Sequence, residues 1–164
     1  MFSLTFNVGG FSLNQLKDKL QEKQIGLNPS AEKLFTDSRL VLSQEPHLVT
    51  LKILTIAELN LKTTATLPNI LLGAQEQGYK LCPLETAIYG RLFWKDQPAS
   101  DDHAMHRHKA PDSAVTFASP ITSTEVNQPK GFYLRHVNNR LWLRGYICDD
   151  DFIWQPENLF AFQK

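Results

Sequence analysis

The chain of 164 residues has few features that commit it to one chemistry. It contains only two cysteines, Cys82 and Cys148, which are too few for a disulfide-stabilised scaffold. Its 17 lysine and arginine residues balance its 17 aspartate and glutamate residues. A net charge of zero disfavours a dedicated nucleic-acid-binding protein, which needs a basic surface for the phosphates, although a local basic patch is compatible with it.

Long apolar runs are also missing. No run reaches the length needed to cross a bilayer, and the first residues, MFSLTFNVGGF, lack the basic start and extended apolar stretch of a secretory signal. The sequence therefore predicts a soluble cytoplasmic protein without a membrane partner. At this length one domain can bury a substantial core. We expect a single α+β domain over residues 1–164, or the same domain with residues 1–60 as a sub-lobe.

The stretch from Gly131 to Phe162 contains a clear hairpin signal. Two runs rich in β-branched, aromatic and leucine residues flank Asn138-Asn139. Asparagine tolerates the positive φ that a type I′ turn needs at both central positions. A two-residue loop pairs Val137 with Arg140 and so fixes the register of the whole hairpin. Leu134 and Leu143 then share one face, which we expect to be buried.

The other face of the hairpin carries only aromatic and arginine residues along its centre. We call this set the aromatic–arginine face; it consists of Tyr133, Arg135, Trp142, Arg144 and Tyr146. Opposed arginine and aromatic residues form cation–π pairs worth about 0.5–1 kcal/mol each when exposed. Such residues are enriched at interface hot spots, and single-stranded nucleic acids stack on them. The face is therefore either a structural ladder or a binding surface.

Regular patterns elsewhere complete the predicted fold. Phe2 to Val8 alternates apolar and polar residues, which is typical of a strand with one buried face. A capping box at Ser12 predicts a helix over 13–24. His47 to Thr55 and Leu159 to Phe162 are predicted strands. We expect an antiparallel sheet, mostly from the C-terminal half, packed against the helices of the N-terminal half.

The C-terminal half also resembles a known group of proteins. Residues 79–98, YKLCPLETAIYGRLFWKDQP, contain a Leu-Cys-Pro segment and a Gln-Pro, and a Leu-Trp-Leu and a Trp-x-Pro follow at 141–143 and 154–156. This pattern resembles that of small bacterial proteins without an established activity. The resemblance implies a bacterial or mobile-element source and transfers no site. It favours a strand over a helix after Gly90, where the residues themselves fit either.

One cluster has the residue types of a metal site. His103, His106 and His108 lie within six residues, beside Asp101 and a second aspartate. Imidazole and carboxylate groups are ligands for zinc, nickel or copper. The spacing is not a common zinc pattern, and a polar loop over 96–112 would not preorganise it. We expect a mobile loop with no bound metal, and we keep the metal site as the alternative.

Two further segments each have a chemical and a structural interpretation. Cys82 lies at a predicted helix start, where the helix N-terminus favours the thiolate, so it is a candidate nucleophile with His103 or His136 as the base. The alternative is an inert buried cysteine. Residues 149–151 are three aspartates that offer oxygens to a hard cation, but they lack the spacing of a calcium loop and read as a solvated turn.

These features favour a non-enzymatic binding module that uses the aromatic–arginine face for a protein partner and needs no cofactor. The alternative is a hydrolase or metal-dependent enzyme that uses the histidine-rich loop 101–108. A nucleic-acid-binding module is the third hypothesis, and the charge balance makes this partner unlikely.

Overall fold

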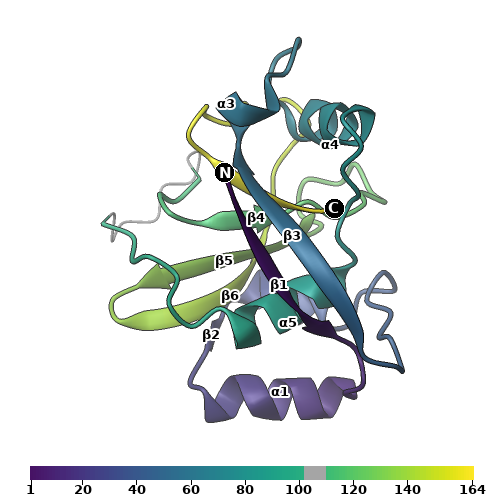
Figure 1. The fold of residues 1–164 in the computed structure, drawn as a ribbon, viewed down its shortest axis with the longest axis vertical. Helices are drawn as coiled ribbons and strands as arrows, with labels where there is room; N and C mark the ends of the chain where they lie inside the picture. The colour runs from purple at the N-terminus through teal and green to yellow at the C-terminus, as the bar shows by residue number, and fades with distance from the viewer. Residues whose placement is uncertain (102–109) are drawn as a thin grey trace.

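The computed structural model describes residues 1–101 and 110–164. Its helices and strands together form an α+β fold, which confirms the predicted class (Figure 1). In chain order the elements are β1 (Phe2–Val8), α1 (Leu13–Glu22), β2 (Gly26–Leu27), α2 (Pro29–Leu34), β3 (His47–Thr55), α3 (Ile56–Leu59), α4 (Leu67–Glu76), α5 (Leu84–Phe93), β4 (Val115–Phe117), β5 (Gly131–Val137), β6 (Arg140–Tyr146) and β7 (Leu159–Gln163).

Within the described residues the strands form one seven-stranded sheet in the order β1-β3-β7-β4-β5-β6-β2. Four neighbouring pairs are antiparallel, whereas β4–β7 and β2–β6 are parallel. The sheet is therefore mixed and differs in these two pairs from the purely antiparallel sheet predicted. Both parallel pairs join strands that are far apart in the chain, and the two-residue β2 is too short to show a periodic pattern.

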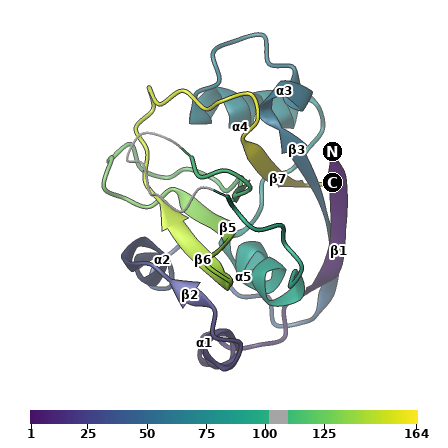
Figure 2. The same ribbon diagram turned by 90° about the vertical axis from the view of Figure 1, so that its left-hand side faces the viewer.

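The sheet curls around α5, with β1 on one side of this helix and the β5–β6 hairpin on the other (Figure 2). A first apolar core fills the space between the sheet and α1, α2 and α5. A second core lies between the other face of the sheet and α3 and α4, and it extends to Trp154. Strand β7 contributes side chains to both cores, because Ala161 belongs to the first while Phe160 and Phe162 belong to the second.

Residues 84–93 form a helix, so the strand favoured after Gly90 is wrong. Every residue from Leu84 to Arg91 is buried. A helix that is buried on all sides has no polar stripe, and its sequence therefore resembles the apolar run of a buried strand. Gly90 allows close packing here, since a Cβ atom at this position would lie 3.0 Å from Cζ of Phe117 and 3.3 Å from Cζ of Phe6.

The predicted helix cap and the predicted hairpin turn, which depend on neighbouring residues, are confirmed. The Ser12 capping box is present, and α1 ends at Glu22, two residues before the predicted end. The hairpin turns at Asn138 and Asn139, which have φ values of 52° and 56°. Both values fit a type I′ turn. The register of the hairpin is the predicted one, and Leu134 and Leu143 are fully buried.

Helix α2 is joined to β6 through Asn28. The Oδ1 atom of Asn28 accepts hydrogen bonds from the N–H groups of Gly145 at 2.8 Å and Ala31 at 2.9 Å. Its Nδ2 atom donates to the carbonyl of Gly145 at 2.9 Å. The side chain thus caps α2 and also continues the pairing of β2 with β6. This packing leaves no space at position 145, where a Cβ atom would lie 2.5 Å from the carbonyl carbon of Ser30.

We expect Gly145→Ala to destabilise the protein by about 3 kcal/mol, because α2 would have to move away from β6. Gly131→Ala is the matched control on the paired strand, where an added Cβ would make ordinary contacts at 3.4 Å or more. It should change the free energy of unfolding by less than about 1 kcal/mol. Urea unfolding of both variants measures the difference, and equal losses would contradict the tight α2–β6 contact.

Candidate functional site

The aromatic–arginine face has the predicted register but is not an open surface. Arg135 lies opposite Trp142, and Tyr133 lies opposite Arg144. Tyr133 is only 6% exposed and Arg135 only 1%. These two side chains therefore do not form an open surface. The physical reason is that the segment after α5 lies against β5, where Ser100 bonds to the carbonyl of His136 and to the guanidinium of Arg135.

One covering segment is anchored at Ser100. The Ser100 N–H donates to the carbonyl of His136 at 2.7 Å, and its hydroxyl donates to Asp112 Oδ1 at 2.5 Å. Arg135 donates through Nη2 to Oγ of Ser100 at 3.3 Å. Gln97, which is also buried, donates to the carbonyl of Leu134 at 3.1 Å. Both ends of the predicted mobile loop are thus hydrogen-bonded to β5 or to each other.

Trp142 belongs to a packed ladder. The guanidinium groups of Arg140 and Arg144 lie 4.7 Å and 5.1 Å from the centre of its ring. These cation–π contacts join neighbours on the same strand, not the opposed residues that were predicted to form them. The ring also covers Gly26 of β2, where a Cβ atom would lie 2.3 Å from it. These contacts support the ladder interpretation for Trp142.

Tyr133 and Tyr146 take part in a concave site instead. They line a cavity of about 540 Å³ at the end of the hairpin, together with the start of α2, residues 110–116 leading into β4, the connection before β5 and the segment after β6. We call it the aromatic pocket, because Tyr133, Tyr146, Phe152 and Trp154 all contribute to its lining. Val126 and Ile147 also line it, and each is 49% exposed. The aromatic pocket therefore opens at an apolar rim.

Edge-to-face aromatic contacts position the inner wall of this pocket. The Trp154 ring lies 5.9 Å from the ring of Tyr146, 5.2 Å from Phe152 and 4.8 Å from Phe160, with interplanar angles between 75° and 89°. Such arrangements add about 0.5–1.5 kcal/mol per pair beyond burial. The backbone N–H of Trp154 also donates to the carbonyl of Ala65 at 2.9 Å. The wall is therefore a fixed aromatic cluster.

Two buried donors in this lining have no acceptor within the described residues. They are the hydroxyl of Tyr146 and the indole N–H of Trp154. Burial raises the pKa of Tyr146, so its hydroxyl keeps its proton and remains a donor. A buried donor without a partner costs about 1–3 kcal/mol. Both atoms are closed to solvent, so they belong to the interior of the wall.

The loop wall of the pocket is held by two cations. Arg39 donates to the carbonyls of Pro120, Pro129 and Lys130 at 2.7–3.0 Å. Asp37 accepts from the same guanidinium at 2.8 Å, and this pairing lowers the pKa of Asp37. The ammonium group of Lys130 is buried and donates to two further loop carbonyls, those of Ser123 and Glu125, at 2.8 and 3.0 Å. The connection between β4 and β5 is thus fixed although it lacks regular structure.

The remaining candidate residues in the described parts of the chain are Cys82 and His136. Cys82 is fully buried, burial raises its pKa, and its Sγ atom lies 3.5 Å from the carbonyl oxygen of Ala161. These features disfavour a thiolate nucleophile. Nδ1 of His136 lies 2.7 Å from the carbonyl oxygen of Gln97.

The structure describes only one of the two candidate metal sites, residues 149–151, and does not describe the histidines of the loop. His103, His106 and His108 lie outside the described residues, so the metal hypothesis for this loop stays a prediction. Within residues 1–101 and 110–164, no group of three histidine, cysteine or acidic side chains is placed to hold a metal ion. This includes residues 149–151, where the N–H of Asp151 donates to the carboxylate of Asp149 in an exposed turn.

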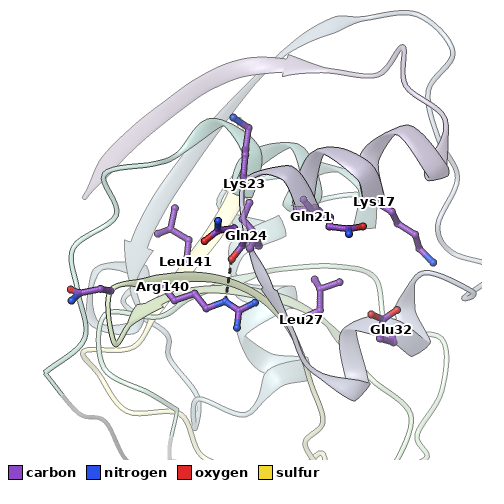
Figure 3. A pocket seen from close by; sticks show the side chains of 11 residues that line it. Lys17, Gln21, Lys23, Gln24, Leu27, Glu32, Arg140 and Leu141 are labelled. Carbon is purple, nitrogen blue, oxygen red and sulfur yellow. Dashed lines mark hydrogen bonds between the residues drawn. The ribbon is translucent and has the colours of Figure 1, made fainter.

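A wider hollow of about 1040 Å³ lies between α1, β2 and the turn of the hairpin (Figure 3). Lys17, Lys23 and Arg140 contribute positive charge to it, and Glu32 contributes a negative charge. Arg140 Nε donates to the carbonyl of Gln24 at 3.1 Å, so this guanidinium is partly engaged within the chain. The hollow is therefore a local surface with more cationic than anionic side chains.

No protein-family model, curated protein or solved structure matches this chain. In the described residues, no helix combines the length and the apolar character needed to cross a membrane.

Cys148 gives a chemical test of the pocket lining. Burial raises its pKa to about 11, Lys130 opposes this shift, and the carboxylates of Asp149 and Asp150 add to it. Only the thiolate reacts with iodoacetamide. In the native protein its alkylation rate should rise about tenfold per pH unit from pH 7 to 10. In unfolded protein the rate should level off above about pH 8.5, the usual thiol pKa. Peptide mapping by mass spectrometry identifies the site, and a native-state plateau near pH 8.5 would contradict the buried environment.

Proposed function

We propose that the protein is a non-enzymatic binding module that recognises a protein partner through the aromatic pocket. The observation that supports this proposal is the combination of a concave aromatic lining with the exposed apolar rim of Val126 and Ile147. Pockets of 300–1,000 Å³ lined by apolar and aromatic groups are typical ligand sites. An exposed apolar rim is typical of protein interaction sites. The binding residues are then Tyr133 and Tyr146 of the aromatic–arginine face, while Arg135, Trp142 and Arg144 support them.

The occupant that fits this site best is one large apolar side chain of the partner together with its adjoining backbone. The apolar side chain would pack on the rings of Tyr133, Tyr146 and Trp154. The adjoining backbone would lie on the exposed rim at Val126 and Ile147, since the Tyr146 hydroxyl and the Trp154 indole N–H are buried in the wall. A buried anchor of this kind carries much of the energy of a protein interface.

We further propose that the protein acts in the bacterial cytoplasm. Both cysteines are free in the structure, which fits a reducing compartment. The bacterial source rests on the sequence resemblance over the C-terminal half.

A selection for peptides tests the proposal. Peptides selected from a random displayed library on the immobilised protein should share one large apolar residue. Ile147→Asp should weaken their binding at least tenfold, because it places a charge on the rim where an apolar contact is desolvated. An interface anchor is worth about 2 kcal/mol, which corresponds to roughly 30-fold in affinity. Fluorescence polarisation with the synthetic peptides gives the dissociation constants.

The matched control is Val41→Asp, which places the same charge on another exposed apolar residue outside the pocket lining. It should leave peptide affinity unchanged. Both sites are exposed, so urea unfolding should show changes within about 0.5 kcal/mol. Peptides without a shared apolar residue, or equal binding to the Ile147→Asp variant, would contradict the proposed site.

A further inference from the structure

The sheet has two edges of unequal length. At one edge, β2 has two residues, and the Asn28 side chain extends its pairing. At the other edge, β1 has seven residues and pairs with β3 along its whole length. In the described part of the chain, no backbone hydrogen bond joins residues 2–8 to any element except β3. One side of β1 therefore presents an unpaired strand edge (Figure 2).

This edge lacks the features that normally prevent strand pairing between molecules. Natural edge strands are protected by charged residues, proline, bulges or short length. The sequence of β1, FSLTFNV, contains no charge and no proline. Its register with β3 runs without interruption from Phe2↔Ile53 to Val8↔His47, so it contains no bulge. A long uncharged strand without a bulge is a template for another strand.

Apolar side chains are exposed beside the same edge. Phe2 is 40% exposed and lies 5.6 Å from the ring of Trp94. Phe93 is 50% exposed and stacks on Phe6 at 5.2 Å. These rings belong to the side of the sheet that α5 covers, and they would extend an apolar layer across a new strand. An added strand would therefore bury apolar surface as well as satisfy backbone groups.

The residue pattern of β1 fits a second copy of itself. If two β1 strands pair antiparallel around Thr5, then Phe2 faces Val8, Ser3 faces Asn7 and Leu4 faces Phe6. Apolar residues then meet apolar residues on one face, and polar residues meet polar residues on the other, over all seven residues. The protein has no net charge, so no long-range repulsion opposes this self-association. A two-fold axis is the commonest symmetry of protein oligomers.

We infer that the protein forms a homodimer in which the β1 strands of two copies pair antiparallel around Thr5 and join their sheets. Sedimentation of the untagged protein over a concentration series should show a monomer–dimer equilibrium. Thr5→Lys should raise the dimer dissociation constant about tenfold or more, because two like charges would face each other across the axis. Thr5→Glu should have the same effect. An equimolar mixture of the two variants should restore dimers that contain one copy of each, as native mass spectrometry would show.

Ser3→Lys is the matched control on the same strand and the same exposed face. In the inferred register its two lysines lie four residues apart along the strands, at about 13 Å, so the dimer should persist. Unchanged urea midpoints would show that the variants fold. A monomer throughout the series would overturn the inference. So would a dimer that withstands both Thr5 substitutions, or a mixture that fails to restore pairing.

Discussion

The buried guanidinium of Arg91 is the constraint on which the arrangement of α5 and the sheet depends. This side chain is fully buried inside the curl of the sheet. It donates hydrogen bonds to the side-chain oxygen of Gln97 and to the carbonyl of Trp94. Burial lowers its pKa to about 10, so it is still charged at neutral pH. A buried charge that loses its partner costs several kcal/mol, and these two acceptors must therefore stay in place.

Gln97 links Arg91 of α5 to the sheet. Its amide donates to the carbonyl of Leu134 in β5 at 3.1 Å and to that of Ser113, shortly before β4, at 3.0 Å. The polar segment after α5 is thereby fixed across β5, and it brings Ser100 over Arg135. This explains why part of the aromatic–arginine face is covered. The buried charge on the helix decides which residues of the hairpin meet solvent.

Features that depend on adjacent residues could be predicted from the sequence, whereas features that depend on residues far apart in the chain could not. The Asn138-Asn139 turn, the Ser12 cap and the alternation of β1 depend on adjacent residues, and the sequence shows them directly. The helical state of α5 depends on being surrounded by the sheet, which removes the polar stripe that would mark a helix. No local pattern could show this.

The candidate site depends on even longer-range contacts. The aromatic pocket combines the start of α2, strands β4, β5 and β6 and three irregular segments, those around Pro111, Val126 and Trp154. Two of its residues, Tyr133 and Tyr146, were found because the hairpin register could be predicted. The irregular walls were missed, because their positions are set by Arg39 and by the aromatic cluster of Trp154 and not by any periodicity. The sequence contains one indication of these walls, which is the position of Trp154 shortly before the last strand, β7.

The two proposed surfaces are compatible with one another. Strand β1 and the β5–β6 hairpin lie on opposite sides of α5 (Figure 2). No residue of β1 lines the aromatic pocket, so pairing at the β1 edge would leave this pocket open. A β1-linked dimer would present two such pockets on one continuous sheet. When two sites can engage one partner or a repeated surface, the overall affinity can exceed that of a single site by about 10²–10⁴-fold without any new contact. Weak anchoring by one apolar side chain would then be sufficient for recognition, provided that the partner presents two anchors at the spacing that the joined sheets impose.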